Sequence, residues 1–480
     1  MKKTPKTPTF IGISGFLDFR VSLNCSKEMN KNTTIQSERL FFEQEDYSHR
    51  WLIFQQSKLG KIYQSIPFKQ LSLLLPTKSV CSVGAPSWFD NAGMFGVMFL
   101  KAYLNLSDEK LVDRLNTDWE LQMFCGRQFK DNQRIKDRNL PSRIRCYMGH
   151  HLSIEPFQDL LVEHWKPFLN ETHCSLFDAT AYESYIKFPT DEKLLWDCCV
   201  WVFESVYVLC KELRVKRPRS KYRDQARKQT AFSKTKKKTY KLRYHRRKSL
   251  LYLLNKGVDF LEKMLCDYIL EIHPAVYKTI QDKLKTVKTI GYQQSYMHEH
   301  PGEYVKDRIV SLFKPYLRPI VRGKENKRVE FGAKLHIYQV DGINIIDKLS
   351  FDPFNEAKNL KGCVIKHKQH FGELYQLGVD NIYGTNENRK YLTGRKIHTC
   401  LPRKGKPSKN EQQSKKLRKE LGKQRATVLE GSFGNEKNHY GLRKIKARTE
   451  PTEVMWILFG IMTANAVKIS KKSPKHKKAA

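Results

Sequence analysis

The sequence predicts an α/β protein, in which a mixed sheet is flanked by helices and accompanied by a helical N-terminal region and a large basic helical insertion. Helical periodicity recurs from about 48 to 170 and again from 191 to about 285. Short apolar runs that end on an acid, at Asp178 and Asp380, are typical of buried strands. The alternating run Val329–Val340 predicts a half-buried strand beside them.

The charge of the chain indicates an anionic partner. Its 480 residues include 88 Lys and Arg against 49 Asp and Glu, a formal net charge of +39. A surplus of this size is typical of proteins that bind nucleic acid or an anionic membrane surface. The 40% hydrophobic and 11% aromatic content supplies a packed core and argues against global disorder.

The hydrophobic segments do not favour a membrane partner. The longest uncharged apolar run, Val454–Val467, is shorter than the roughly 20 residues that a span requires, so we expect a buried helix. The apolar stretch Phe10–Leu17 has no small-residue cleavage site after it and does not match a signal peptide. Eleven cysteines without a Cys-x-x-Cys pair predict free thiols in a reducing cytoplasm.

The N-terminal part divides into two predicted segments. Residues 1–45 show no sustained period and are expected to be irregular, whereas residues 46–170 are expected to form a helical domain. Ser107 predicts a helix start, because a serine N-cap is followed by two acids and then by one apolar face. The domain is a candidate for DNA binding or dimerisation, and simple core packing of its helices is the alternative.

The predicted sheet begins with the apolar run Cys174–Asp178 and continues after the insertion with a hairpin. Asp341-Gly342 follows Val329–Val340 directly, and Ile343 begins a second run, which is a strong signal for a two-residue turn. After the hairpin we expect a helix near Asn355–His370 and a strand over Tyr375–Asp380. A helix from about Asn386, a strand near Ile397–Leu401 and a basic helical region to about Asn438 are expected to complete the core. The tail 470–480 is expected to be disordered.

Two basic clusters are candidates for DNA contact. Lys211–Lys248 contains 18 basic and two acidic residues with interleaved aromatic residues, a composition that favours backbone contact over a merely solvated run. From it we take as candidates Arg217, Arg219, Lys237, Arg246 and Arg247. The second cluster precedes the hairpin and supplies Arg322, Lys324 and Arg328. Such clusters grip phosphates without reading bases.

Three carboxylates are candidates for the chemistry. Asp178 and Asp380 end predicted neighbouring strands, and Glu430 lies on the later helix. Carboxylates in such positions can hold two divalent cations about 3.5 to 4 Å apart, an arrangement that serves phosphoryl transfer. Their hard oxygen ligands suit Mg²⁺ or Mn²⁺.

Four blocks of the sequence resemble those of bacterial and archaeal insertion-sequence transposases of the DDE class. They are Leu176–Asp191 (beginning LFDATAYES), Leu317–Lys334 (beginning LRPIVRGKEN), Gly378–Leu392 (beginning GVDNIYGTN) and Leu429–Leu442 (beginning LEGSFGNEK). Met94–Gly126 is similar to the helical domain that precedes the catalytic core in this family. The resemblance extends over about residues 50 to 470.

The resemblance implies an RNase H-like catalytic domain at 171–469, with its helical insertion at about 191–300. It implies that Asp178, Asp380 and Glu430 bind two Mg²⁺ (or Mn²⁺) ions per active site. Lys437, seven residues after Glu430 and so on the same helix face, is expected to contact a phosphate. The resemblance further implies that the protein cleaves DNA at terminal inverted repeats and carries out strand transfer. It implies that the partner is double-stranded DNA and that the protein acts on it at least as a homodimer, at the nucleoid.

Two positions depart from the family pattern. The family places an Arg one turn before the catalytic Glu, where this chain has Ala426, and Arg425 is the nearest candidate. Val379 stands where relatives have Ala, a mild change that leaves the acid in place. Two alternatives stay open: a catalytically inactive or repurposed DNA-binding protein derived from a transposase, and a non-transposing RNase H-like nuclease.

Overall fold

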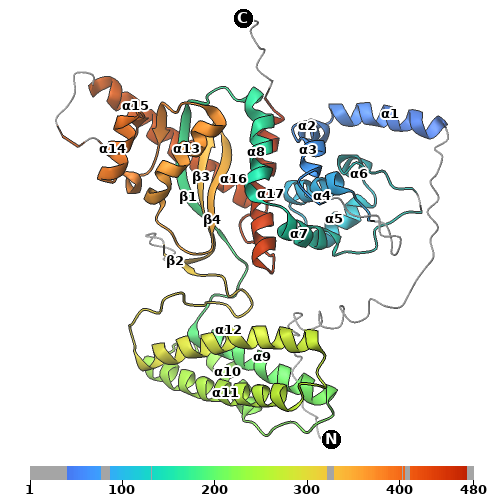
Figure 1. Ribbon diagram of the computed structural model, residues 1–480, viewed down its shortest axis with the longest axis vertical. Helices are drawn as coiled ribbons and strands as arrows, with labels where there is room; N and C mark the ends of the chain where they lie inside the picture. The colour runs from blue at the N-terminus through green and yellow to red at the C-terminus, as the bar shows by residue number, and fades with distance from the viewer. Residues whose placement is uncertain are drawn as a thin grey trace, which may run out of the picture. The chain divides into compact units, whose positions relative to one another are not determined.

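A computed structural model describes residues 41–76, 87–130, 132–321, 329–402, 404–405 and 411–472. The protein is a mixed α/β structure in which helices outweigh strands (Figure 1). The chain divides into two units after Leu52, and α1 (Phe41–Gln56) spans that division. Helix α1 begins within the segment predicted to be irregular, because from Phe41 onward no Gly or Pro interrupts the helix. The predicted irregular residues 1–40 lie outside the described residues.

In the described part of the chain, seven α-helices follow α1 in sequence and precede the first strand. They are α2 (Lys58–Gln64), α3 (Phe68–Ser72), α4 (Asn91–Leu104), α5 (Asp108–Leu115), α6 (Trp119–Phe124), α7 (Leu140–His151) and α8 (Ile154–Trp165). The predicted start of α5 is confirmed, because the Ser107 hydroxyl accepts a hydrogen bond from the Lys110 amide at 3.2 Å. Its apolar face is fully buried, as the pattern predicts, at Leu111, Val112 and Leu115.

Six strands form a mixed sheet. Their bounds are β1 (Cys174–Glu183), β2 (Pro319–Val321), β3 (Val329–Val340), β4 (Ile343–Ser350), β5 (Gln376–Gly378) and β6 (His398–Thr399). Strand β1 is central, antiparallel to β3 on one side and parallel to β5 on the other. Strand β6 continues the sheet in parallel beyond β5, and β2 and β4 both pair antiparallel with β3.

The β3–β4 hairpin forms at the predicted place. Val340 pairs with Ile343, so Asp341 and Gly342 alone make the turn. Both have positive φ, 47° and 84°, which is the backbone conformation of the two-residue turn that suits the twist of paired strands.

The two faces of the sheet carry different helices (Figure 1). Side chains alternate along β1, so Asp178, Thr180 and Tyr182 share one face. This face meets α16 (Glu430–His439), since the Tyr182 hydroxyl donates a hydrogen bond to Glu436. Phe177 points to the opposite face, where its ring contacts that of Tyr338, and the Tyr338 hydroxyl lies 2.6 Å from a His370 nitrogen of α13 (Leu360–Phe371).

The last helix, α17 (Glu450–Ile469), is the buried helix that the apolar run predicts. By length and composition it could cross a membrane, but 78% of its 18-residue apolar window is buried inside the protein. Thr449 begins it with a capping box, in which Thr452 returns the hydrogen bond.

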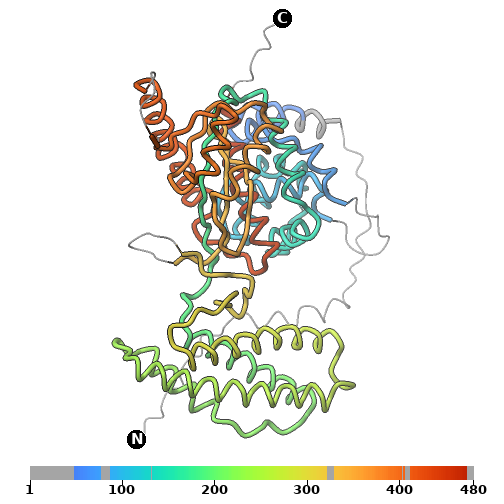
Figure 2. Tube along the Cα trace, turned by 60° about the vertical axis from the view of Figure 1, so that its left-hand side comes forward, coloured from blue at the N-terminus to red at the C-terminus, as the bar shows by residue number. Residues whose placement is uncertain are grey.

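The predicted insertion corresponds to four helices that run side by side (Figure 2). They are α9 (Asp191–Glu212), α10 (Tyr222–Lys234), α11 (Tyr240–Asp267) and α12 (Pro274–Glu299). Helix α11 packs closely on α9 at Gly257, where a Cβ would come within 2.9 Å of Val202 and 2.8 Å of Phe203. The remaining helices of the core are α14 (Asn386–Gly394) and α15 (Glu411–Gln424).

Gly332 provides a test of the β1–β3 packing. A Cβ there would lie 2.0 Å from the backbone oxygen of Tyr182, which no side-chain motion can relieve. We expect Gly332→Ala to lower the free energy of unfolding by about 1–3 kcal/mol, as overpacking does. Gly362→Ala in α13 is the control, because a Cβ there meets nothing within 4 Å and a helical Ala gains about 0.5–1 kcal/mol. Denaturant unfolding measures both, and equal stability of the two variants would contradict this packing.

Candidate active site

The strand register brings Asp178 and Asp380 side by side. Strands β1 and β5 are parallel, and Leu176 pairs with Gly378. Asp178 follows Leu176 by two residues, and Asp380 follows Gly378 by two residues. Both acids therefore lie at the same level and on the same face of the sheet. Neighbouring strands are about 4.8 Å apart, which leaves the two carboxylates free to share a ligand.

Asp380 is held by the end of its strand and by a short helix. It caps the 3₁₀ turn Asn381–Tyr383, and its carboxylate accepts a hydrogen bond from the Asn381 amide at 2.7 Å. The Cys400 thiol donates to the carbonyl of Val379 at 2.9 Å and fixes the preceding residue to the end of β6. The side chain of Asp380 is exposed, so it is accessible to a ligand.

A single turn of π-helix brings an arginine to the carboxylates. Arg425–Leu429 is π-helical and leads directly into Glu430. A π-turn bonds residues five apart, so Arg425 takes the place that the fourth residue before Glu430 would have in an α-helix. Its Nη1 lies 3.0 Å from Asp178 Oδ2 and 3.1 Å from Glu430 Oε1. The family pattern expects an arginine one turn before the glutamate, where this chain has Ala426. One extra residue in the π-turn places Arg425 at the site instead.

A buried polar network fixes α16, which carries Glu430, to the sheet. Glu436 is 1% exposed and accepts hydrogen bonds from the Tyr182 hydroxyl of β1 and, at 2.6 Å, from the Asn344 amide of β4. The same Asn344 amide donates to the Ser432 hydroxyl at 2.8 Å. Burial raises the pKa of Glu436. Because the partners of Glu436 and Ser432 lie on two different strands, β1 and β4, rotation or translation of α16 would leave buried polar groups unpaired.

The pKa of Asp178 depends on its burial and on the charges around it. Burial raises the pKa of Asp178 from 3.8 to about 6, against the hydrogen bond from the Ala179 amide and the charge of Arg425, which lower it. The charges of Glu356 and Asp380 raise it further. Glu356 already pairs with Lys334 at 2.8 Å. A divalent cation among these carboxylates would favour the charged form of Asp178.

Lys437 lies beside the strand that carries Asp178. Its Nζ is 3.3 Å from the Thr180 hydroxyl and 5.5 Å from the centre of the Tyr182 ring. Thr180 is two residues beyond Asp178 on the same face of β1. The predicted spacing of Glu430 and Lys437 thus places both side chains on the side of α16 that faces this part of the sheet.

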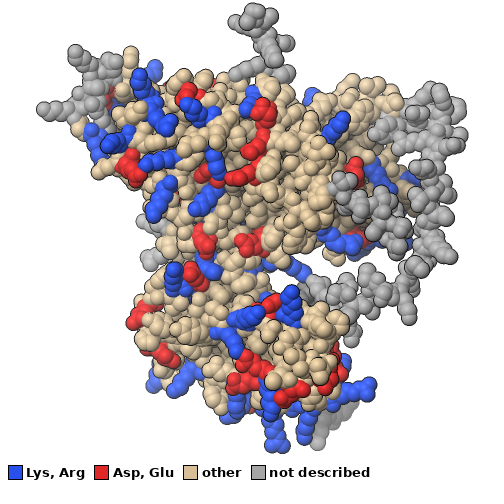
Figure 3. All heavy atoms as spheres, viewed as in Figure 1, with Lys and Arg blue, Asp and Glu red and all other residues tan. Residues whose placement is uncertain are grey.

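The basic residues of the insertion divide into two groups. Arg217, Arg219 and Lys237 are exposed. On the face of the insertion that Figure 3 draws, basic side chains lie with acidic ones between them. Arg246 is buried and donates to Gln229 at 2.8 Å and to Gln225 at 2.6 Å, so its guanidinium packs α11 against α10.

Arg247 is also turned inward, 3.6 Å from Asp191 and 4.0 Å from Glu192. Arg246 and Arg247 thus have partners inside the insertion, and DNA contact by them stays a prediction. The predicted cluster of Arg322, Lys324 and Arg328 lies outside the described residues.

Comparison with known proteins supports one part of this assignment. Residues 48–145 match the family model described as Transposase domain (DUF772). The match supports a transposase family for the chain, and it lies N-terminal to all three candidate acids. No curated protein and no solved structure matches the chain.

The raised pKa of Asp178 predicts a pH-dependent stability. A carboxyl whose pKa is higher in the folded state stabilises the fold below pH 4 and loses that contribution as pH rises to about 6. Asp178→Asn keeps a neutral side chain, so we expect the variant to exceed the wild type by about 3 kcal/mol well above pH 6 and to equal it near pH 4. Denaturant unfolding across this range measures the difference. A variant that is less stable than the wild type at pH 7 would show that the ion pair with Arg425 prevails.

Proposed function

We propose that the protein is a DDE transposase of an insertion element, which binds terminal inverted repeats and carries out metal-dependent DNA strand cleavage and strand transfer. One observation carries the proposal: the paired residues Leu176 and Gly378 on adjacent parallel strands each precede an acid, Asp178 or Asp380, by two residues, and Glu430 contacts the same arginine nitrogen as Asp178. The transposase-domain match at 48–145 supports it independently.

The topology supports an RNase H-like core. An antiparallel hairpin, β3–β4, flanks the central β1, and two parallel strands, β5 and β6, continue the other side. The first two acids stand on β1 and just after β5, and the third stands on a helix packed on the same face. This is the arrangement that the four sequence blocks lead one to expect.

The donor set fits Mg²⁺ or Mn²⁺. Asp178, Asp380 and Glu430 offer only carboxylate oxygens, the ligands that these hard cations prefer, and the buried Asp178 gains most from added positive charge. A bound pair of such ions supplies activation of an attacking water or 3′-hydroxyl and stabilisation of the leaving oxygen. The three acids would hold the ions from three separate elements of the core.

The basic side chains at the site have separate tasks. Arg425 keeps Asp178 and Glu430 oriented toward each other through its two ion pairs. Lys437, held beside Thr180, is placed to contact a phosphate of the bound strand. Both act by position and charge, and neither needs to transfer a proton.

The partner that we propose is double-stranded DNA, both element ends and target. The net charge of +39 and the exposed basic residues of the insertion support backbone contact. Joining two element ends requires two active sites, so we propose a homodimer or higher oligomer on DNA, in the cytoplasm at the nucleoid and without a membrane partner. DNA binding or dimerisation by the N-terminal helices belongs to the same proposal.

A second candidate is an inactive DNA-binding protein derived from a transposase. The ion pairs of Arg425 favour it, because they already neutralise part of the charge of Asp178 and Glu430. A non-transposing RNase H-like nuclease shares the same site and differs only in the absence of strand transfer. Cleavage and strand-transfer assays separate the three.

The catalytic proposal predicts a specific pattern of loss. With Mg²⁺ and DNA carrying the ends of its own element, we expect Asp178→Asn, Asp380→Asn and Glu430→Gln each to lower the cleavage rate by about 10³-fold or more, because each removes a ligand worth several kcal/mol. Electrophoretic binding assays should show DNA affinity within a few-fold of the wild type.

Asp113→Asn on α5 is the matched control and should cleave normally. Full cleavage by any of the three variants would refute the assigned triad. Binding without cleavage by the wild type under Mg²⁺ and Mn²⁺ would establish the inactive protein instead.

The DNA-binding proposal predicts a change in salt dependence. Replacing Arg217, Arg219 and Lys237 with Ala should weaken DNA binding and reduce the slope of log affinity against log salt by up to about 2.7, or about 0.9 per lost phosphate contact. The control replaces three exposed lysines outside the insertion, Lys368, Lys390 and Lys396. Equal changes in both variants would show that the insertion has no special part in binding.

A further inference from the structure

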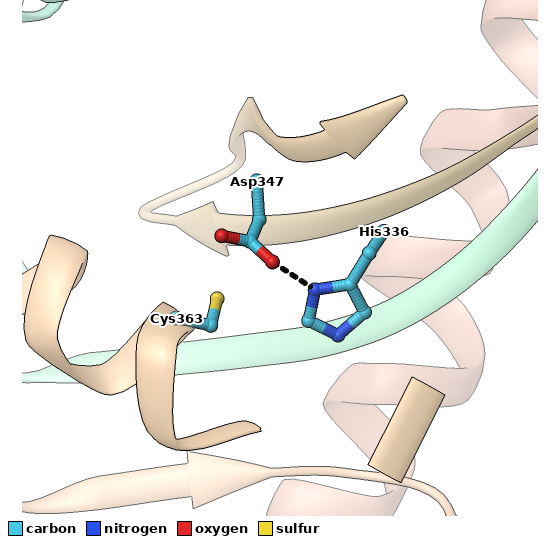
Figure 4. Close-up of side chains that lie close together, drawn as sticks. All are labelled: His336, Asp347 and Cys363. Atoms are coloured by element: carbon cyan, nitrogen blue, oxygen red, sulfur yellow. Dashed lines mark hydrogen bonds and ion pairs between the residues drawn. The ribbon is translucent and has the colours of Figure 1, made fainter. Parts of the chain in front are cut away.

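A buried His–Asp–Cys cluster lies on the sheet edge formed by the hairpin (Figure 4). His336 comes from β3, Asp347 from β4 and Cys363 from α13, and one donor atom of each lies within 4.8 Å of the other two. His336 Nδ1 is 2.8 Å from Asp347 Oδ2. His336 and Cys363 are fully buried, and the side chain of Asp347 is 8% exposed.

A β-bulge directs the aspartate toward the histidine. His336 pairs with Lys348 and Ile337 pairs with Ile346, so Asp347 is an extra residue between the two pairs. Bulges commonly redirect a side chain, and here the extra residue brings the carboxylate to the His336 ring. A regular ladder would give His336 a single residue opposite, so the arrangement depends on this irregularity.

The cluster is separate from the candidate active site. In the β1–β3 ladder His336 pairs with Ala179, whereas Asp178 pairs with Ile337. Adjacent residues of a strand point to opposite faces, so His336 and Asp178 lie on opposite faces of the sheet. The three side chains therefore have no direct part in the proposed chemistry.

We propose that His336, Asp347 and Cys363 bind one Zn²⁺ ion. Zinc is bound by just these donor types, at about 2.3 Å for thiolate and 2.0–2.2 Å for imidazole and carboxylate. Ligand atoms of a tetrahedral ion are about 3.3–3.6 Å apart, so closing the cluster needs movements of about 1 Å or less. The sulfur and nitrogen donors exclude Mg²⁺ as the preferred ion, and the fourth position is left for water.

The surroundings support the carboxylate as a ligand. Lys366 Nζ lies 3.2 Å from Asp347 Oδ1, so the oxygen that does not face His336 is already held. Hydrogen bonding of the non-ligating atom is the usual support for a metal-bound carboxylate. Burial raises the pKa of Asp347. The hydrogen bond and charge of His336, together with the charge of Lys366, outweigh this effect and bring the pKa below its usual value.

Zinc binds the thiolate form of cysteine, so a bound ion would replace the proton of the buried Cys363 thiol. The bound ion would fasten α13 to both strands of the hairpin, on the face opposite α16. Its effect is on stability, because ligand binding to the folded state alone stabilises it.

Cobalt substitution tests the site directly. Metal-free full-length protein, kept reduced with a phosphine, is titrated with Co²⁺ while its absorbance is recorded. We expect one equivalent to produce a thiolate-to-Co²⁺ charge-transfer band and visible bands of tetrahedral cobalt, and Zn²⁺ to displace it. An all-oxygen site such as that proposed at Asp178 cannot give the thiolate band, so Asp178→Asn should keep it.

Two variants assign the ligands. Cys363→Ser should lose the charge-transfer band, whereas Cys266→Ser, at an exposed free cysteine, should retain it. Asp347→Asn can still accept a hydrogen bond from His336, and we expect about tenfold or greater loss of Zn²⁺ affinity. Zn²⁺ should raise the unfolding temperature of the wild type and not that of Cys363→Ser. Absence of the band and of this rise in the wild type would overturn the proposal and leave a hydrogen-bonded core cluster.

Discussion

The parallel pairing of β1 with β5 is the constraint on which the candidate active site depends. It joins segments 202 residues apart, and the pair Leu176–Gly378 sets Asp178 level with Asp380. Gly378 permits this pairing, because a Cβ there would lie 2.6 Å from a methyl of Leu176 and 3.2 Å from the backbone oxygen of Leu421 in α15. A shift by one residue would turn one acid to the opposite face of the sheet. The insertion between the strands is tolerated because lengthening a loop adds only slowly to the entropy of closing it.

The third carboxylate is positioned by polar contacts, with little help from apolar packing. Helix α16 contains few apolar residues, and the buried Glu436 holds it to Tyr182 of β1 and Asn344 of β4. Asn344 is bound in turn by Asn465 of α17, whose amide donates to its carbonyl at 2.7 Å. The network therefore couples Glu430 to the buried helix α17. Arg425 acts at the other end of the turn and couples Glu430 to Asp178.

Local sequence signals predicted most of the elements and none of the contacts between distant side chains. The Asp341-Gly342 turn, the Ser107 cap and the apolar run of α17 are encoded within a few residues, and each is confirmed. The two strands were predictable from their apolar runs, but their ends were not, since β1 continues past Asp178 to Glu183 and β5 ends at Gly378, before Asp380. The role of Arg425 was not, since a π-turn changes the helical period without a clear local signal. The inward turn of Arg246 and the bulge at Asp347 likewise depend on partners far along the chain.

The central claim is that Asp178, Asp380 and Glu430 form one site for divalent metal. Crystals of the protein grown with Mn²⁺, measured at a wavelength where manganese scatters anomalously, test it most directly. The account predicts anomalous peaks in contact with carboxylate oxygens of all three residues. Peaks confined to other acids, with Arg425 still bridging Asp178 and Glu430, would contradict it.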